Sequence, residues 1–461
     1  MNVQPDNDEL LTLLKSALTN AYALGRYDEA EKFLRMILTI QPDSIDAYND
    51  LGIILKVLAR PDEAIEVYQQ ALTLDPNNPK LHNNLANIFK ETGDFEPAES
   101  HYSKALEHDP AYVDAHRNLG MLYKEFHRYD DAESSYRQAL LHDPQLIKTQ
   151  ANLSFLLLEQ GRFEEGWKLY ETRYDPQINP TFFTPALTFP QWSGESLKKR
   201  SILILPEQGY GDEIQFVRYL SELKKRGVAR ITLLCKAPLK RLFSTLDTID
   251  RIITSVEEIE EHDYWSFLLS LPLHMNTTLD TIPAHLPYLS VRDEWIDHPI
   301  RQSNTFNIGI IWRGSASHDN DHNRSLSTLS MLEPLWKITG TTFFGLQKEL
   351  SAEDAALLTN TPIIDLSASM EDFADTAALI SQLDLVICVD TAVAHLCGAL
   401  AKPCWVLLPY TLCDWRWLQK REDSPWYPNV MRLFRQNSPN EWNKTIQEVA
   451  DALEKRVQSL P

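Results

Sequence analysis

The polar residues best suited to group transfer lie in residues 383–409, where a buried strand should end and a helix begin. Leu385–Val389 is an unbroken apolar run, which indicates a parallel strand buried on both faces. Asp390 and Thr391 follow it directly, and His395 lies one helical turn further on. Free N–H groups at the start of such a helix favour phosphate, so the pattern predicts a phosphate site. The structural alternative is that Asp390 and Thr391 only cap the helix and that His395 is an ordinary core histidine.

Three carboxylates lie near the end of another predicted strand. Residues 201–205 form a short apolar run, and the glycine-containing sequence PEQGYG follows it. Glu207 lies in this loop, and Asp212 and Glu213 open the next helical pattern. A carboxylate at the carboxyl edge of a sheet can act as a general base, so all three are candidate catalytic residues. Asp212 also fits a capping box as the N-cap, with Gln215 at N3, which is a purely structural interpretation.

Basic and amide side chains near further strand ends are candidates for nucleotide binding. Arg313 and Arg324 lie in the loop after the apolar run 307–312 and could reach the same phosphate, or could be ordinary solvated charge. Gln347, at the end of another run, is a candidate for the nucleoside. The sequence Asp319–Asn320–Asp321 imitates a DxD metal motif, but that motif has meaning only in its own fold, so no metal site is predicted.

The first third of the chain is an internal repeat. A small residue and a proline recur every 34 positions, and an aromatic residue does so with one residue of slippage: Ala30, Ala64, Ala98 and Ala132; Pro42, Pro76, Pro110 and Pro144; Phe33, Tyr68, Tyr102 and Tyr136. This pattern closely resembles the tetratricopeptide repeat, in which the small residue lies where two helices touch. Four repeats run from about residue 11 to 144, and Gly166 replaces the alanine in a degenerate fifth. Such arrays usually bind an extended protein segment, although scaffolding or dimerisation is the alternative.

The remainder of the chain predicts two α/β domains. Apolar runs that alternate with helical patterns indicate parallel, doubly wound sheets. The predicted strands are 201–205, 231–235, 251–254, 267–271, 307–312, 342–346, 385–389 and 404–408. The predicted domains are a repeat array at 1–173, a linker at 174–200, Rossmann-like domains at 201–304 and 305–440, and a C-terminal helix at 441–461. Prolines forbid a continuous helix in the linker, and Phe182, Phe183, Phe189 and Trp192 favour an extended segment packed against its neighbours.

Residues 201–440 resemble the lipopolysaccharide heptosyltransferases, which are glycosyltransferases of the GT-B fold. The resemblance rests on Gly211–Asp212, on the basic loop 313–324 and on D-T-x-x-x-H at 390–395. The whole layout is similar to bacterial proteins that join tetratricopeptide repeats to such a domain, with stretches like EQGYGDEIQFVRYL, VDTAVAHLCGAL, DWRWL and SPWYP, as here. Ala392 stands where the heptosyltransferases usually have glycine, next to the diphosphate, so their donor cannot be carried over.

The resemblance implies both a fold and an activity. The fold would be a tetratricopeptide-repeat α-superhelix followed by a GT-B module, with the acceptor on 201–304 and the nucleotide-sugar on 305–440. The activity would be an inverting, metal-independent protein O-glycosyltransferase without a cofactor, with Asp212 as the general base and Glu207 and Glu213 as rivals. The donor-binding residues would be Asp390, Thr391, Ala392, His395, Arg313, Arg324 and Gln347. Some similar proteins glycosylate flagellin, which makes flagellin a candidate acceptor.

Two other functional classes stay open. One is a non-catalytic tetratricopeptide adaptor with a degenerate transferase domain, which the joint presence of Asp212, Asp390, Thr391 and His395 disfavours. The other is a sugar-nucleotide epimerase of the same two-domain fold, which would need no protein-binding array. Association of copies through the repeats is also open. The aromatic residues Trp415, Trp417, Trp426 and Tyr427 could stack on a substrate, but core packing is expected for most of them.

Composition excludes several classes of partner. The formal net charge of −21 gives no basic footprint for nucleic acid, and an anionic membrane surface would repel the chain. No apolar run is long enough for a membrane span, and the acidic first residues show no signal peptide. The 5 cysteines are scattered without a CxxC pair, which is typical of reduced thiols. We therefore expect a cytoplasmic protein without stable membrane insertion.

Overall fold

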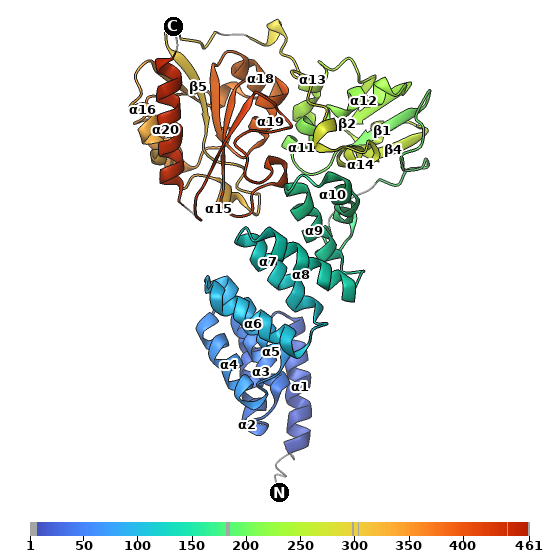
Figure 1. Ribbon diagram of the computed structural model, residues 1–461, viewed down its shortest axis with the longest axis vertical. Helices are drawn as coiled ribbons and strands as arrows, with labels where there is room; N and C mark the ends of the chain where they lie inside the picture. The colour runs from blue at the N-terminus through green and yellow to red at the C-terminus, as the bar shows by residue number, and fades with distance from the viewer. Residues whose placement is uncertain (1–6, 181–184, 297–298, 303, 440, 460–461) are drawn as a thin grey trace. The chain divides into compact units, whose positions relative to one another are not determined.

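The computed structural model describes residues 7–180, 185–296, 299–302, 304–439 and 441–459. Helical repeats come first, and two parallel β-sheets flanked by helices follow (Figure 1). The predicted fold class, a tetratricopeptide-repeat array followed by a GT-B-like module, is confirmed. The chain divides into two compact units, Met1–Leu156 and Leu157–Pro461.

The first unit consists of antiparallel helix pairs, one pair for each repeat. Its helices are α1 (Asn7–Ala23), α2 (Tyr27–Ile40), α3 (Ile45–Val57), α4 (Pro61–Leu74), α5 (Pro79–Thr92), α6 (Phe95–His108), α7 (Val113–Glu125) and α8 (Tyr129–His142). The four alanines with the 34-residue period all have 0% of their surface exposed. A Cβ on Gly52 would lie 2.4 Å from the ring of Tyr68, and one on Gly120 would lie 2.6 Å from the ring of Tyr136. Small residues therefore let the two helices of a repeat approach closely, as the periodicity predicts.

Asparagine side chains connect the first helices of successive repeats. Asn84 Nδ2 of α5 donates to Asn49 Oδ1 of α3 at 2.8 Å. Asn118 Nδ2 of α7 donates to Asn83 Oδ1 at 3.0 Å and to Asn87 Oδ1 at 3.1 Å. Buried amides are stable only when they are paired, so these bonds fix the register between neighbouring repeats.

The degenerate fifth repeat is divided between the two units. It comprises α9 (Ile147–Glu159) and α10 (Phe163–Tyr170), and the boundary between the units falls within α9. This differs from the predicted end of the array at residue 173. Phe163 and Trp167 of α10 belong to the main hydrophobic core of the second unit, because their aromatic partners lie there.

The first sheet of the second unit is parallel and four-stranded, in the order β3–β2–β1–β4. Its strands are β1 (Ser201–Leu205), β2 (Arg230–Leu234), β3 (Arg251–Ile253) and β4 (Tyr264–Phe267), and the helices with it are α11 (Tyr210–Phe216), α12 (Tyr219–Lys225), α13 (Lys240–Phe243) and α14 (Leu271–His274). Ile202 and Ile204 of β1 face the core that these helices share, whereas Leu203 and Leu205 face a separate cluster that contains Phe189. Among the described residues, the cluster on this second face contains the linker residue Phe189 and no residue of α11, α12, α13 or α14, which differs from the predicted double winding.

The linker runs along β4. Trp192 N donates to Trp265 O at 2.7 Å, and Trp265 N donates to Pro190 O at 3.0 Å. This pairing extends the sheet by a short parallel bridge. The predicted extended, packed segment is therefore found over these residues, whereas Phe182 and Phe183 lie outside the described residues.

The second sheet is parallel and six-stranded, in the order β10–β9–β8–β5–β6–β7. Its strands are β5 (Phe306–Ile311), β6 (Thr341–Gly345), β7 (Ile363–Asp365), β8 (Leu385–Val389), β9 (Cys404–Leu408) and β10 (Met431–Arg435), and its helices are α15 (Asp321–Arg324), α16 (Glu333–Trp336), α17 (Ala352–Leu358), α18 (Phe373–Ser381), α19 (Ala392–Ala399) and α20 (Trp442–Gln458). Val386 and Cys388 of β8 face the core with α18 and α19, and Ile387 and Val389 face the core with α20. The helix α20 lies on one side of this sheet, and α18 and α19 lie on the other (Figure 1). Both faces are covered, as the unbroken apolar run predicts.

The predicted strands differ from the observed ones in two respects. The predicted strand 267–271 is wrong, because β4 ends at Phe267 and a 3-10 turn, Leu268–Ser270, leads into α14. The strands β7 and β10 were not predicted. Each lies at an edge of the second sheet, where exposed or charged residues interrupt the apolar pattern.

Candidate active site

The candidate residues meet where α11 of the first lobe (the sheet β1–β4 with its helices) abuts α19 of the second lobe (the sheet β5–β10 with its helices). A Cβ on Gly211 would lie 2.8 Å from Cδ2 of His395 and 3.3 Å from the Cα of Ala392. Glycine at position 211 therefore lets the starts of the two helices touch. As a result, the predicted base region around Asp212 lies beside the predicted phosphate region around Thr391.

Asp212 occupies a different position in its helix from the one predicted. The N-cap of α11 is Gly209, and Asp212 is at N3, where its Oδ2 accepts from Gly209 N at 2.7 Å. The prediction of Asp212 as N-cap with Gln215 at N3 is wrong, because the helix begins at Tyr210, one turn earlier. The carboxylate still satisfies a backbone donor of the first turn, so it keeps a capping function.

Arg416 lies beside Asp212, although no local pattern in the sequence predicts this contact. Its guanidinium bonds the other oxygen of Asp212 through Nη2 and bonds Asp414 Oδ2 through Nη1 at 2.7 Å. Only 6% of the Arg416 side chain is exposed, against 15% for Asp212. Burial alone would lower the pKa of Arg416, but the carboxylates of Asp414 and Asp212 raise it above its ordinary value. A permanent positive charge therefore lies beside the candidate base.

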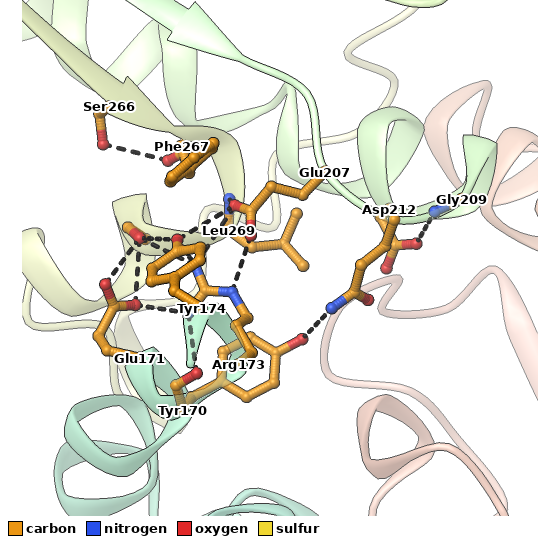
Figure 2. Close-up of polar contacts among 12 residues, drawn as sticks. Tyr170, Glu171, Arg173, Tyr174, Glu207, Gly209, Asp212, Ser266, Phe267 and Leu269 are labelled. Carbon is orange, nitrogen blue, oxygen red and sulfur yellow. Dashed lines mark hydrogen bonds and ion pairs between the residues drawn. The ribbon is translucent and has the colours of Figure 1, made fainter. Parts of the chain in front are cut away.

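The rival carboxylates Glu207 and Glu213 are enclosed in ion pairs. Glu207 Oε2 accepts from Arg173 Nε at 2.8 Å, and its Oε1 accepts from Leu269 N at 2.9 Å (Figure 2). Glu213 Oε1 accepts from Lys236 Nζ at 2.7 Å. The side chains of the two glutamates are 0% and 1% exposed. Burial raises the pKa of each, and their lysine or arginine partners oppose that shift. Neither carboxylate can reach an acceptor hydroxyl in this arrangement, which leaves Asp212 as the accessible candidate.

The residues at the start of α19 have fewer hydrogen-bond and ion-pair partners than these carboxylates. Thr391 is the N-cap, but its side chain makes no capping hydrogen bond, and among the described residues its buried Oγ1 has no partner. Burial and then the carboxylate of Asp414 raise the pKa of Asp390 to about 6, against the opposing charges of Arg324 and Arg416. An unpaired hydroxyl at a helix N-terminus is suited to bind an anion.

His395, the predicted phosphate donor, is held in place by aromatic neighbours. Its Nδ1 is hydrogen-bonded to Tyr427 Oη at 2.9 Å, and its ring stacks on Trp417 with centroids 5.3 Å apart. Burial, and then the charges of Arg416 and Arg218, lower its pKa well below the ordinary value. His395 is therefore a neutral ring that packs between the lobes.

Of the predicted nucleotide-binding residues in the loops of the second lobe, Gln347 and Arg313 contact each other, and Arg324 pairs with Asp321. Gln347 Oε1 accepts from Arg313 N at 3.1 Å. The guanidinium of Arg313, however, forms an ion pair at 2.7 Å with the fully buried Asp354. Arg324 packs over Gly314 and lies 3.3 Å from Asp321 Oδ1, close enough to Asp390 to act on its pKa. Both arginines thus have a carboxylate partner, and only Arg324 is also found to act on the pKa of Asp390, in the predicted phosphate region.

The four aromatic candidates all lie in the core. Trp415, Trp417, Trp426 and Tyr427 are between 0% and 4% exposed. Trp415 packs against Trp167 of α10 at 5.2 Å between centroids. Packing between elements therefore accounts for them, as expected for most of the set.

Comparisons with known proteins agree with this architecture. The TPR repeat family matches residues 60–93, and the tetratricopeptide repeat family matches 78–140. Glycosyltransferase family 9 (heptosyltransferase) matches residues 340–412, which include Gln347, Asp390, Thr391 and His395. The chain joins tetratricopeptide repeats to a heptosyltransferase-like glycosyltransferase module. The predicted resemblance is thus confirmed, and the matched stretch ends before Arg416.

One curated relative matches more than half of the chain. Protein FlbA of Caulobacter vibrioides is 27% identical over 320 residues. That match spans 63% of this chain and 52% of FlbA, so the chain covers about half of that relative's length.

Solved structures also resemble part of the chain. They include PilF of Pseudomonas aeruginosa (21% identity, 39% of this chain, 80% of that chain, TM-score 0.34), a thermophilic TPR protein of Thermus thermophilus (23%, 37%, 92%, 0.32) and MamA of Desulfovibrio magneticus (17%, 40%, 100%, 0.32).

Within the described residues, no group of three or more His, Cys, Asp or Glu side chains is arranged to hold a metal ion. Metal independence therefore stays a prediction.

No helix among the described residues is both long and apolar enough to cross a bilayer.

Proposed function

We propose that this glycosyltransferase-like chain transfers a sugar from a nucleotide-sugar to a hydroxyl group of a polypeptide that the repeat array binds. The observation that carries the proposal is the contact between Gly211 and His395. It supports the proposal because it places an accessible carboxylate, Asp212, next to the start of α19, where Thr391 has an unpaired hydroxyl.

These positions support the following reaction. Asp212 accepts the proton of the acceptor hydroxyl, whose oxygen attacks the anomeric carbon while the bond from that carbon to the phosphate oxygen breaks. The configuration is inverted, and the nucleotide leaves as an anion. The N–H groups of α19, the Thr391 hydroxyl and the nearby guanidinium of Arg324 stabilise the negative charge that grows on the phosphate. No metal ion and no cofactor are required by this scheme.

The repeat array supports a protein acceptor. Tetratricopeptide arrays bind extended segments of other proteins, and a transferase for a small acceptor has no need of one. Flagellin, suggested by the resemblance, is the acceptor we propose to examine first.

The proposal is tested in two steps. The full chain is screened with UDP, GDP, ADP and CDP by thermal shift, since a ligand that binds the folded state raises the melting temperature. The nucleotide-sugar that corresponds to the binder is then incubated with flagellin, and the intact mass of flagellin is measured. Binding followed by a mass increase of one or more sugars supports the proposal. Binding of no nucleotide by the folded chain contradicts it and favours the adaptor alternative.

A shortened chain tests the division of labour. The chain beginning at Leu157 keeps α10 and should bind the same nucleotide but fail to modify the protein acceptor. The cut is placed at Leu157 rather than near Arg200, because α10 belongs to the core of the module. Full protein modification by this shortened chain would contradict acceptor binding by the array.

A further inference from the structure

A buried polar network joins the end of the last repeat to the loop that precedes Asp212. Arg173 lies in a 3-10 turn, Glu171–Tyr174, directly after α10. Its Nε donates to Glu207 Oε2 at 2.8 Å (Figure 2). Its Nη2 donates to Ser270 Oγ at 2.9 Å. The Arg173 side chain is 7% exposed and that of Glu207 is 0% exposed. This pair is therefore shielded from water, where geometry matters most.

The loop between β1 and α11 is held at successive residues. Gln208 has a φ of +50°, a left-handed conformation that a non-glycine residue adopts only when its surroundings impose it. Its Nε2 donates to Tyr170 Oη at 3.1 Å, and its carbonyl oxygen accepts from Lys236 Nζ at 2.6 Å. The next residue, Gly209, donates to Asp212. Three consecutive loop residues therefore connect α10 and the turn after it to the candidate base: Glu207 binds Arg173, Gln208 binds Tyr170, and Gly209 binds Asp212.

The helix α10 is itself fixed to both lobes of the module. Trp167 Nε1 donates to Thr277 O of the first lobe at 3.1 Å. The rings of Trp167 and Tyr170 pack on Trp415 of the second lobe, with centroids 5.2 and 5.9 Å apart. Trp415 directly precedes Arg416, the partner of Asp212. The same short helix therefore supports both sides of the Asp212–Arg416 contact.

We propose that Arg173 is a positioning residue for the transfer reaction, because its ion pair with Glu207 holds the loop 206–209 before α11 and so places the carboxylate of Asp212. The end of the repeat array is then an integral part of the catalytic module. This inference rests on the proposed function, in which Asp212 is the base.

The charges of this pair point to a role in placement. A buried ion pair can often be replaced by neutral residues of similar size without loss of stability. Stability alone therefore does not explain why Arg173 and Glu207 are charged. The two ions instead impose a directional contact between segments 34 residues apart. Glu207 cannot itself be the base, since no part of its side chain is exposed.

The test replaces both charges at once. The double variant Arg173→Met with Glu207→Gln removes both fully enclosed charges. Glu171, the other carboxylate that Arg173 binds, at 2.6 Å, is 28% exposed and can be solvated, so the variant should fold. The matched control is Arg230→Met with Glu260→Gln, a solvent-exposed ion pair of the same lobe whose side chains are 40% and 53% exposed. Hydrogen exchange is measured by mass spectrometry in the full-length proteins for peptides covering 206–216 and, as a reference, α12.

If Arg173 positions the loop, exchange in 206–211 becomes about tenfold faster in the double variant while α12 and the melting temperature are unchanged. Sugar transfer to the protein acceptor then falls about 10- to 100-fold in kcat, and the affinity for the nucleoside diphosphate found by screening stays the same. The control variant should show none of these changes. Unchanged exchange in 206–211, or unchanged kcat in a folded double variant, overturns the inference. The exchange measurement needs no substrate, so it shows whether the ion pair holds the loop even if the wild-type protein transfers no sugar. Absence of transfer by the wild type would count against the proposed function alone.

Discussion

Asp212 and Arg416 form an ion pair across the two lobes although 204 residues separate them in the sequence. Asp414 is the second partner of the guanidinium, at 2.7 Å. Arg416 therefore keeps one carboxylate partner if the Asp212 side chain moves away from it, for instance to approach an acceptor hydroxyl. The contact also explains why both lobes are needed at the site, since the base comes from one and its charged neighbour from the other.

Replacement of Asp212 by Asn should abolish chemistry and leave the fold nearly intact. The Asn carbonyl can still accept from Gly209 N, and Arg416 keeps Asp414, so the loss of stability should be well below the roughly 3–5 kcal/mol of an orphaned buried charge. Turnover should fall about 10²- to 10⁴-fold, as for a lost general base, with donor affinity unchanged. Steady-state kinetics and a thermal melt measure the two effects.

Glu213→Gln is the comparison for that variant. Glu213 is buried against Lys236, so its replacement should lower the melting temperature by leaving the lysine poorly paired, without a comparable loss of kcat in the folded fraction. Near-normal turnover of Asp212→Asn together with inactive but folded Glu213→Gln would refute the assignment of the base.

Thr391→Val should weaken nucleotide binding and nothing else. The hydroxyl has no hydrogen-bond partner among the described residues, so its removal costs the folded protein little. If it donates to a phosphate, calorimetry should show an affinity loss of about 1.5–3 kcal/mol for the nucleoside diphosphate, roughly 10- to 150-fold. His395→Ala is not an equivalent test, because it also removes the contacts with Tyr427 and Trp417. An unaltered affinity in a folded Thr391→Val protein would remove the phosphate from this helix.

Asp390 should make nucleotide binding depend on pH. Its pKa is raised to about 6, so the group is mostly neutral at about pH 5 and mostly charged at about pH 7. A charged Asp390 next to an incoming phosphate repels it, and affinity should therefore fall as pH rises through about 6. The phosphate of the ligand titrates in the same range, so the informative quantity is the difference between the wild type and Asp390→Asn. The Asn variant should bind more tightly than wild type at about pH 7 and no more tightly at about pH 5. Parallel profiles would show that Asp390 does not contact the phosphate region.

The fold could be predicted from the sequence where burial is complete. Strands β8 and β9 read as unbroken apolar runs, and their predicted bounds agree with the structure. Strand β10 could not be recognised, since Arg432 and Arg435 interrupt its pattern at the edge of the sheet. The end of β4 was misplaced because Leu268 and Leu271 continue the apolar run into a different conformation.

The site was predictable only in its local parts. Asp212 and Thr391 could be proposed as candidates because each follows a buried strand, a relationship that neighbouring residues reveal. The pairing of Arg416 with Asp212 and of Arg173 with Glu207 depends on contacts between distant segments, which spacing within one stretch does not show. The charge of Arg313 was predicted to face a phosphate, yet a buried carboxylate 41 residues later neutralises it.

A histidine pair in the repeat array should make the array sensitive to acid. Nδ1 of His82 and Nδ1 of His101 are 2.9 Å apart, and Nε2 of His82 lies 3.0 Å from the carbonyl oxygen of Pro76. The carbonyl can only accept, so Nε2 of His82 carries its proton, its Nδ1 accepts, and His101 donates. A second proton on His82 would set two N–H groups face to face.

Both pKa shifts agree with this arrangement. Burial, and then the neighbouring His82 and Lys104, lower the pKa of His101 to about 4, and burial also lowers the pKa of His82. A histidine with a depressed pKa in the folded state takes up protons more readily when unfolded. The stability it contributes is therefore present above about pH 6.5 and is lost as the pH falls toward about 4.

The variant His101→Asn isolates this effect. Its amide can still donate to His82 Nδ1, but it does not titrate. The midpoint of urea unfolding, followed by the far-ultraviolet circular dichroism of the helices, should fall less between about pH 7.5 and pH 4.5 in this variant than in the wild type. His142→Asn, at an exposed position of α8, is the matched control and should follow the wild type. If His101→Asn loses as much stability in acid as the wild type does, the acid sensitivity lies elsewhere and the pair is only a packing contact.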